Sequence, residues 1–250
     1  MLLETAGLTK RFGGVTAVNA VDLAVDERTT LGLIGPNGAG KTTLINLISG
    51  VLTADEGAIR FAGADISREP AHRLAARGIA RTFQGVRVFK GLSVLDNVLI
   101  GAHTRLRPDV LLRLAPTRGR TDPADALALL ERVGLARARA GALAGELAYG
   151  DQRRLEIARA LASRPRLLIL DEPAAGMNPT ESLALRSLMR SLVTDGLTII
   201  LIEHDVRLVM GACDRVVVLN FGRKIADGSP AEIQRDPVVR EAYLGSEDAA

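Results

Sequence analysis

The sequence predicts an α/β fold in which a mainly parallel sheet carries an antiparallel β subdomain and an inserted helical subdomain. Three observations predict it. Short alternating apolar segments open the chain, apolar runs alternate with helical patterns from residue 164 onward, and the stretch between them, residues 70–163, is mainly helical. Strands that alternate with helices are typical of a parallel sheet, so the helical stretch is expected to be an insertion in an α/β core.

Length and composition favour a soluble protein from a reducing compartment. At 250 residues the chain can bury a large core without disulfides, and its single cysteine, Cys213, cannot form an internal disulfide. Cys213 is expected to be a small buried hydrophobe rather than a nucleophile. We recognise no N-terminal signal sequence, and the longest apolar runs are far shorter than the roughly 20 residues that span a bilayer. A cytosolic protein, able to dock on a membrane protein, is expected.

The positive charge of the chain does not by itself indicate a partner. The net charge is +3 and the pI is about 9.4, and the densest patch of arginines lies in residues 105–120. Such a patch suits lipid headgroups, nucleic acid or water, of which we favour a solvated surface. Aromatic residues make up 3% of the chain and do not interleave with the patch, so no nucleic-acid partner is expected.

The first strands and turns follow from short local patterns. Residues 2–9 and 20–25 are expected to form antiparallel strands around a Phe-Gly-Gly break, and residues 55–67 a further strand pair. Within residues 30–50 an apolar strand enters a glycine-rich turn, and a helical pattern leaves it.

The second half of the chain supplies two buried strands and an amphipathic helix. The strands end in Leu-Leu-Ile-Leu-Asp-Glu-Pro (167–173) and in Ile-Glu-His-Asp (202–205), with the helix over 179–193 between them. In the helical insertion we expect loops at 85–91 and 105–122 and a helix from about Gln152 to Ala162. Residues 246–250 are expected to be frayed.

The glycine-rich turn matches the phosphate-binding motif G-x-x-x-x-G-K-[ST] between a strand and a helix, which is the context that the motif requires. Glycines let successive backbone N–H groups face phosphate oxygens, and the helix N-terminus adds positive charge. Lys41 is expected to reach the β- and γ-phosphates and the Thr42 hydroxyl to bind Mg²⁺. A turn without a ligand is the weaker alternative. The predicted binding residues are Gly35, Pro36, Asn37, Gly38, Ala39, Gly40, Lys41, Thr42 and Thr43.

A pair of carboxylates follows the first buried strand of the second half. Asp171 ends the strand and Glu172 stands beside it. We expect Asp171 to hold Mg²⁺ through water and Glu172 to polarise the attacking water. A Leu-Asp-Glu-Pro turn is a weak signal alone, but together with the phosphate-binding loop it predicts ATP hydrolysis.

These two motifs and the stretch LAYGDQRRLEIARAL (147–161) resemble, in this order, the ATP-binding cassette (ABC) ATPases. The family signature, Leu-Ser-Gly-Gly-Gln, precedes a helix upstream of the Walker B strand and acts in trans on the nucleotide of a second subunit. The positions here are Leu147, Ala148, Tyr149, Gly150 and Asp151. The resemblance implies one P-loop NTPase cassette: a RecA-like core with an antiparallel β subdomain (1–85 and 164–228), a helical signature subdomain (86–163) and a C-terminal tail (229–250).

The same resemblance implies roles for residues outside the three motifs. Phe12 lies where the family stacks an aromatic ring on adenine, and Val18 belongs to the same nucleotide-binding set. Gln84 matches the Q-loop glutamine that senses Mg²⁺, His204 the switch histidine, and Asn178 the D-loop position. Each has a plain alternative: core packing for Phe12, a loop amide for Gln84, a satisfied polar group for His204. Their order and spacing favour the functional roles.

The signature departs from the family pattern at two positions. Ala148 lacks the serine hydroxyl that would donate to the γ-phosphate, and Asp151 replaces the glutamine with a negative charge. Backbone N–H groups near Gly150 and the helix N-terminus remain as donors. Losing one hydrogen bond to a charged group costs about 1.5–3 kcal/mol, which weakens such a site without abolishing it. For Asp151 we favour a structural role as the helix N-cap.

Two segments look most like ATP-binding subunits of bacterial branched-chain amino-acid importers: residues 80–103 and the tail, residues 228–245. The resemblance implies an ATP-sandwich dimer with a second ABC ATPase subunit, identical or different, membrane permease subunits, and indirectly a periplasmic solute-binding protein. The subunit would lie on the cytoplasmic face of the membrane. The apolar loop beyond Gln84, which includes Val88 and Phe89, is expected to receive a short permease helix.

Two alternatives within the family remain. A lipopolysaccharide-export ATPase has a similar cassette and tail, but it would more readily show a proline before the glutamine and a Ser-Gly-Gly signature than Arg-Thr-Phe-Gln and Leu-Ala-Tyr-Gly-Asp. A non-transport ABC ATPase, such as an iron–sulfur assembly ATPase, is the other. Co-purification with membrane permeases, or with soluble scaffold proteins, would separate a transporter subunit from an iron–sulfur assembly ATPase.

Overall fold

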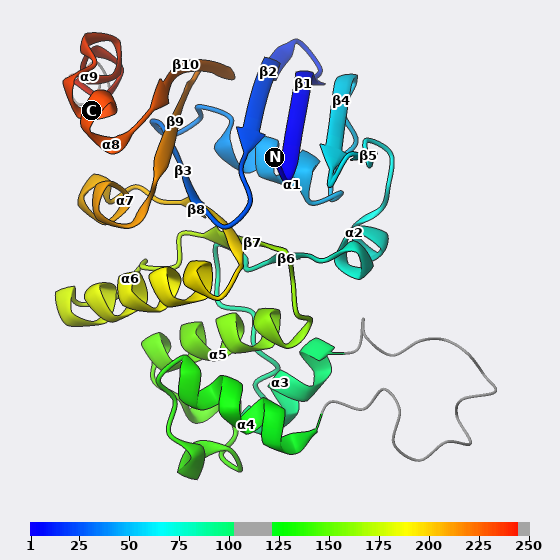
Figure 1. Ribbon diagram of the computed structural model, residues 1–250, viewed down its shortest axis with the longest axis vertical. Helices are drawn as coiled ribbons and strands as arrows, with labels where there is room; N and C mark the ends of the chain where they lie inside the picture. Colours follow the sequence, from blue (N-terminus) through cyan, green and yellow to red (C-terminus); the bar gives the residue numbers. More distant parts are fainter. Residues whose placement is uncertain (103–121, 245–250) are drawn as a thin grey trace.

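The computed structural model describes residues 1–102 and 122–244, and it shows two sheets above a group of helices (Figure 1). The α/β fold class is confirmed, with an antiparallel sheet, a mainly parallel sheet and a helical part in one chain. The arginine patch of residues 105–120 and the frayed end at residues 246–250 lie outside the described residues.

The antiparallel sheet has four strands in the order β2-β1-β4-β5. They are β1 (Leu3–Phe12), β2 (Val15–Val25), β4 (Glu56–Phe61) and β5 (Ala64–Asp65). Phe12 pairs with Val15 across the Gly13–Gly14 turn, where Gly13 takes a φ of +55°. Such a conformation favours glycine, which explains the Phe-Gly-Gly break. The first two strands extend to this turn and are longer than predicted.

The second sheet has six strands in the order β10-β9-β3-β8-β7-β6. They are β3 (Thr30–Ile34), β6 (Ile79–Arg81), β7 (Leu167–Asp171), β8 (Thr198–Ile202), β9 (Arg215–Asn220) and β10 (Arg223–Gly228). All neighbouring strands are parallel except β9 and β10. Every residue of β3, β7 and β8 is buried, as is typical of a parallel sheet covered on both faces.

Strand β6 lies within the stretch, residues 70–163, that the sequence pattern describes as mainly helical. It pairs with β7, with Ile79 opposite Leu167 and Arg81 opposite Ile169. A strand of three residues is too short to show an alternating pattern, and only the long-range pairing with β7 defines it.

The helices fall into two groups. The lower group in Figure 1 consists of α3 (Val94–Gly101), α4 (Pro123–Arg132) and α5 (Tyr149–Ala162). The remaining helices are associated with the sheets: α1 (Lys41–Ile48), α2 (Ala71–Arg77), α6 (Pro179–Thr194), α7 (Val206–Ala212), α8 (Pro230–Arg235) and α9 (Pro237–Leu244). Helix α6 coincides with the predicted amphipathic helix and extends it by one residue. None of the helices in residues 1–102 and 122–244 is both long and apolar enough to cross a membrane.

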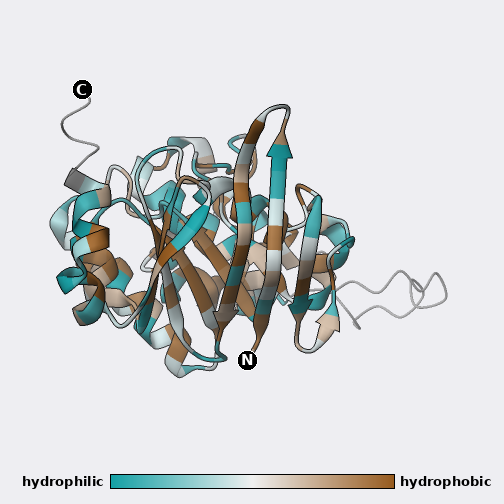
Figure 2. Ribbon diagram, turned by 90° about the horizontal axis from the view of Figure 1, so that it is seen from above, coloured by the Kyte–Doolittle hydropathy of each residue, from teal (hydrophilic) through white to brown (hydrophobic). Residues whose placement is uncertain are grey.

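The core lies on both faces of the parallel sheet. Along β7, Leu167 and Ile169 join the cluster that also contains the apolar residues of α1, whereas Leu168 and Leu170 join the cluster of the helical part, α6 and α7. Side chains alternate between the two faces of a strand, which explains the division. Figure 2 shows the apolar residues gathered on the central strands and polar residues along the outer helices. Cys213 is buried as predicted, and this burial raises the pKa of its thiol to about 12.

Gly101 marks the close contact of α3 with α5. A Cβ atom at Gly101 would lie 2.1 Å from the carbonyl oxygen of Arg159, whereas one at Gly141 would meet no atom within 4 Å. We therefore expect Gly101→Ala to lower the free energy of unfolding by about 1–3 kcal/mol, because the helix backbones must separate. Urea denaturation measures the change, with Gly141→Ala as the control. Equal unfolding midpoints for the two variants would contradict this view of the contact.

Candidate functional site

The phosphate-binding loop runs from β3 into α1 and is held closely by its neighbours. A Cβ atom at Gly35 would lie 2.1 Å from the carbonyl oxygen of Leu219, and one at Gly40 would lie 2.3 Å from that of Ala17. Only glycine fits at these two positions. Gly40 is the N-cap of α1 and offers no side-chain hydrogen bond. The first-turn N–H groups of α1 therefore lack a side-chain cap and suit an anion.

Lys41 lies over this loop. Its Nζ atom donates to the carbonyl oxygens of Gly35 at 2.6 Å and Pro36 at 2.9 Å. Burial lowers the pKa of Lys41, while the negative charges of Glu172 and Asp171 oppose that effect. The loop, its lysine and the two carboxylates thus form one electrostatic unit. Thr42, directly after Lys41, is exposed at the start of α1.

Asp171 is held by an arginine that the sequence did not indicate. The carboxylate Oδ2 lies 2.8 Å from Nη2 of Arg81, and both side chains are more than nine-tenths buried. Arg81 also donates to Oδ1 of Asn46 at 2.6 Å, and the backbone N–H of Asp171 donates to the Thr82 hydroxyl at 3.2 Å. Arg81 belongs to β6, the strand that the sequence pattern missed, so nothing in the sequence distinguished it from a surface arginine.

Glu172 contacts two other predicted residues, Gln84 and His204. The amide Nε2 of Gln84 donates to both carboxylate oxygens of Glu172 at 3.3 Å, and Nε2 of His204 lies 2.8 Å from Oε1. Glu172 has a φ of +48°, and its N–H donates to the carbonyl oxygen of Ile202 at 2.9 Å. A non-glycine residue in this conformation is strained, and such strain is concentrated at functional sites. The structure therefore brings Gln84, Glu172 and His204 together directly after the strands β6, β7 and β8.

The side chains near Lys41 fit a magnesium ion. Mg²⁺ is usually bound by one or two carboxylates together with the phosphates of a nucleotide. The exposed Thr42 hydroxyl, the Asp171 carboxylate and the Gln84 amide could supply such oxygen ligands. Across residues 1–102 and 122–244 there is no cluster of three or more histidine, cysteine or acidic residues that would hold a metal without a nucleotide.

The signature residues begin α5, and the prediction that Asp151 caps this helix is wrong. The helix begins at Tyr149 rather than at about Gln152, and its N-cap is Ala148, which makes no side-chain cap bond. The N–H of Gln152 already donates to the carbonyl oxygen of Ala148 at 2.9 Å. Asp151 therefore lies within the first helical turn, where its carboxylate is 3.6 Å from the Arg154 guanidinium. A negative charge there still complements the helix dipole.

The signature contacts the segment after Glu172 rather than the phosphate-binding loop of its own chain. A Cβ atom at Gly150 would lie 2.8 Å from Oε1 of Glu181, and one at Gly176 would lie 3.2 Å from the Tyr149 ring. Asn178 caps α6 in a reciprocal arrangement with Glu181. Figure 1 shows α5 below β7 and β6, and α1 above them. The structure thus joins the signature to the D-loop position and leaves Ala148 and Tyr149 exposed, whereas Leu147 is buried.

The two residues expected near the adenine differ in exposure. Phe12 is 47% exposed at the end of β1, with Nζ of Lys10 at 5.6 Å from its ring centroid, so it does not pack in the core. Val18 is completely buried among the core residues of β2. The place of Val18 in the nucleotide-binding set stays a prediction, since its side chain packs in the core of the subunit.

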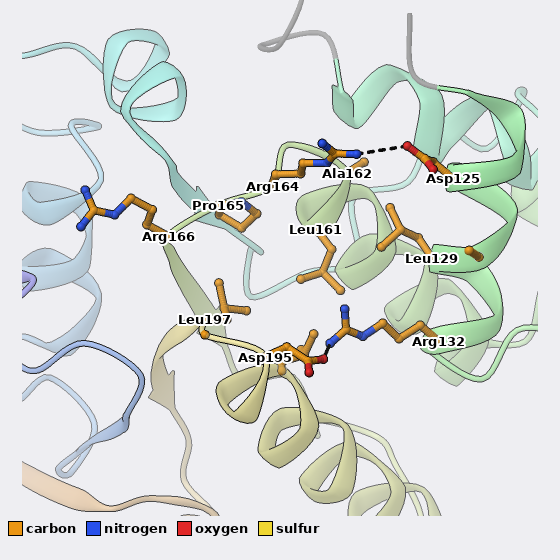
Figure 3. Close-up of a pocket in the computed structure, with 13 residues that line it drawn as sticks. Asp125, Leu129, Arg132, Leu161, Ala162, Arg164, Pro165, Arg166, Asp195 and Leu197 are labelled. Atoms are coloured by element: carbon orange, nitrogen blue, oxygen red, sulfur yellow. Dashed lines mark hydrogen bonds and ion pairs between the residues drawn. The ribbon is translucent and has the colours of Figure 1, made fainter.

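A cavity of about 480 Å³ lies apart from this site, between α4 and the C-terminal ends of α5 and α6 (Figure 3). Its arginines already have acidic partners: Arg164 lies 3.1 Å from Asp125, and Arg132 bonds to Asp195. Because these charges are paired, the residues of the cavity that the structure describes offer no free cation for a phosphate.

Known proteins share this arrangement over nearly the whole chain. The family model described as "ABC transporter" matches residues 18–175, and that of the "Branched-chain amino acid ATP-binding cassette transporter" matches residues 223–249. Among curated relatives, the chain is 46% identical to the high-affinity branched-chain amino acid transport ATP-binding protein BraF of Pseudomonas aeruginosa, covering 98% of each chain. It is 44% identical to LivG of Escherichia coli K12, again covering 98% of each.

A more distant relative and a solved structure complete the comparison. The lipopolysaccharide export system ATP-binding protein LptB of Acidithiobacillus ferridurans is 36% identical over 98% of each chain. The crystal structure of the ADP conformation of an ATP-binding cassette from an ABC transporter is 33% identical, with a TM-score of 0.85 and 98% of each chain covered.

The buried carboxyl group of Glu203 is expected to make a pH-dependent contribution to stability. It accepts hydrogen bonds from the N–H groups of Ala174 at 2.7 Å and His204 at 3.3 Å, and burial raises its pKa above the ordinary value of 4.5. Because its pKa is raised, Glu203 keeps its proton up to a higher pH in the folded state than in the unfolded state. Stability is therefore lost as the pH rises from 4.5 through the folded-state pKa.

We therefore expect Glu203→Gln, which cannot titrate, to become more stable relative to the wild type as the pH rises through that window, and the difference to stay constant above it. Urea denaturation of both proteins between about pH 4.5 and pH 8 measures the difference. A difference that does not change with pH would show that the burial of Glu203 has no such effect.

Proposed function

The chain belongs to the ABC transporter family of ATP-binding cassettes, and we propose that it is the ATP-hydrolysing subunit of an importer for branched-chain or related amino acids. Two observations support the choice of solute class. The relatives at 46% and 44% identity carry that transport function in their names, and the tail matches the corresponding family model. The lipopolysaccharide-export relative is less similar, at 36% identity, and the non-transport alternative has no counterpart among these relatives.

The contacts of Glu172 are the single observation that best supports the proposed hydrolysis of ATP. A carboxylate beside the phosphate-binding loop can polarise a water molecule for attack on the γ-phosphate. His204, at 2.8 Å from Oε1, holds the carboxylate in place and donates to it when Nε2 carries the proton. Gln84 contacts both oxygens and is placed to respond to the phosphate. Lys41 and the N–H groups of the loop neutralise the phosphate charge.

Thr42 and Asp171, with Gln84 nearby, would hold Mg²⁺. When bound, the ion neutralises charge on the phosphate oxygens during transfer. The Arg81 guanidinium fixes the Asp171 carboxylate at the end of β7, so one oxygen of Asp171 is already committed to a hydrogen bond. The other oxygen is the one that we assign to the hydrated ion.

A second ABC ATPase subunit is proposed to complete the site. The signature lies away from the phosphate-binding loop of its own chain, and Tyr149 is 47% exposed beside the exposed Ala148. Helix α5 has no side-chain cap, so its first-turn N–H groups suit the γ-phosphate of a nucleotide bound to the partner. An ATP-sandwich dimer would bring these groups together, with Phe12 on the adenine of its own subunit.

A groove beside the Q-loop is proposed to bind the permease. This coupling groove has a volume of about 550 Å³ and lies between the loop after Gln84, α2 and α3. Its apolar lining includes Val51, Ala75, Val88 and Phe89, and the Phe89 side chain is 48% exposed. The Arg159 guanidinium lies 5.3 Å from the Phe89 ring, which adds positive charge to the groove. A short amphipathic helix with an acidic residue fits this surface.

The coupling groove also bears on the location of the subunit in the cell. A permease helix that reaches it from the membrane would hold the chain at the cytoplasmic face, as a peripheral subunit. A periplasmic solute-binding protein would then act through the permeases without touching this chain. Because Gln84 lies between the groove and Glu172, a shift of the Q-loop links permease position to hydrolysis.

Glu172→Gln is expected to stop turnover without loss of ATP binding, because the phosphate-binding loop remains intact while the carboxylate is lost. Lys41→Ala is expected instead to weaken ATP binding, since the ammonium over the phosphates is removed. Titration calorimetry of the subunit and ATPase assays of the assembled complex measure the two effects. Hydrolysis at the wild-type rate by Glu172→Gln would show that another group activates the water.

Phe89→Asp is expected to leave the subunit folded and able to bind ATP, but to detach or uncouple it from its permeases. The added carboxylate would disrupt the apolar coupling groove, and Phe89 is too exposed to be needed for the core. Val238→Asp, at a residue that is 50% exposed on α9, is the matched control. Membrane vesicles that contain both permeases measure ATP-driven amino-acid uptake. Normal uptake with Phe89→Asp would exclude this groove as the permease site.

A further inference from the structure

Arg153 has contacts that the mechanism above does not use. It lies in the second turn of α5 and is completely buried. Its Nη1 donates to the carbonyl oxygen of Phe83 at 2.8 Å, and its Nη2 donates to those of Gln84 at 3.2 Å and Glu172 at 3.3 Å. One guanidinium therefore joins the signature helix, the Q-loop and the residue that holds the catalytic carboxylate.

Glu156, one turn later on α5, adds two contacts to this set. Its Oε2 lies 3.0 Å from Nη1 of Arg153, and its Oε1 accepts the N–H of Phe83 at 3.4 Å. The buried pair thus binds both polar groups of Phe83, directly before Gln84. A buried ion pair gives little net stability compared with apolar residues of the same size, so stability alone does not account for it.

The contact with Glu172 acts on a strained part of the chain. The φ of +48° at Glu172 persists only if surrounding groups fix its backbone on both sides. Ile202 accepts its N–H at 2.9 Å, while Arg153 and the N–H of Ala175 bind its carbonyl oxygen at 3.3 Å and 3.2 Å. Of these groups, only Arg153 comes from a different part of the fold than the parallel sheet and the turn that follows β7.

We propose that Arg153 is a positioning residue for ATP hydrolysis, which holds the backbones of Gln84 and Glu172 against the signature helix. The side chains of Gln84 and Glu172 then meet at 3.3 Å because their backbones share one guanidinium. The inference rests on the proposed role of Glu172. In the proposed dimer, α5 faces the nucleotide of the partner, so Arg153 also ties the position of that helix to the catalytic residue of its own chain.

Two variants separate positioning from folding. Arg153→Lys keeps a positive charge beside Glu156, but a single ammonium cannot reach the three carbonyl oxygens that the forked guanidinium binds. The double variant R153M E156L removes both charges and leaves neither one buried alone. Arg190→Lys is the control: Nη2 of Arg190 also donates to a backbone carbonyl, that of Gly211 at 2.9 Å, on the outer part of α6.

ATPase kinetics of the complex assembled with its permeases, with ATP affinity and thermal unfolding of the subunit, test the proposal. We expect kcat to fall on the order of 10- to 100-fold in both variants, because small displacements of a catalytic group have effects of that size. ATP affinity should stay within about threefold, since the phosphate-binding loop is untouched. Arg190→Lys should keep the wild-type kcat.

Two results would overturn the proposal. One is a kcat within twofold of the wild type in a folded Arg153→Lys or R153M E156L complex. The other is loss of the folded state in both variants, which would make Arg153 a structural residue. Hydrolysis of ATP at the wild-type rate by the Glu172→Gln complex would contradict the proposed function instead. The two failures can therefore be told apart.

Discussion

The register of three buried parallel strands is the constraint on which the site depends. Ile202 of β8 lies opposite both Leu33 of β3 and Asp171 of β7. The phosphate-binding loop, Glu172 and His204 each follow these positions within two residues, so they emerge at the same edge of the sheet. Because both faces of the sheet are buried, a slip by one residue would exchange the faces of every side chain in the strand. The apolar packing of the strands therefore also fixes the geometry of the proposed catalytic residues.

Two buried arginines connect these strands to the loop that follows β6. Arg81 pairs with Asp171 at 2.8 Å, and Arg153 binds the carbonyl oxygens of Phe83 and Gln84. Each guanidinium is neutralised by a buried carboxylate, and each also binds neutral polar groups whose burial would otherwise be unfavourable. The Q-loop thus begins from a backbone that is fixed on both sides.

The division of the fold into sheets and helices matches a division of chemical tasks. The parallel sheet presents groups suited to phosphate, magnesium and water. The helical part presents the signature and one wall of the coupling groove, both of which face away from the core. The groups at the proposed catalytic site suit phosphate and adenine rather than an amino acid. The solute class is associated instead with the overall identity to the relatives and with the tail.

The sequence by itself determined the features that depend on neighbouring residues. It predicted the α/β fold, the phosphate-binding loop, the carboxylates after β7 and the burial of Cys213, because each has a local pattern of glycine, charge or apolar residues. The resemblance to a family supplied Gln84 and His204, which no local pattern distinguishes from ordinary polar residues.

Only the tertiary structure decided what depends on contacts between distant segments. β6 exists because three residues pair with β7, and Arg81 and Arg153 are site residues because other segments bury them. Asp151 lies inside α5 rather than at its cap. A charged residue in a sequence gives no sign of its burial, and a helix begins where backbone hydrogen bonds allow. Both are fixed by packing across the whole chain, which a local pattern does not contain.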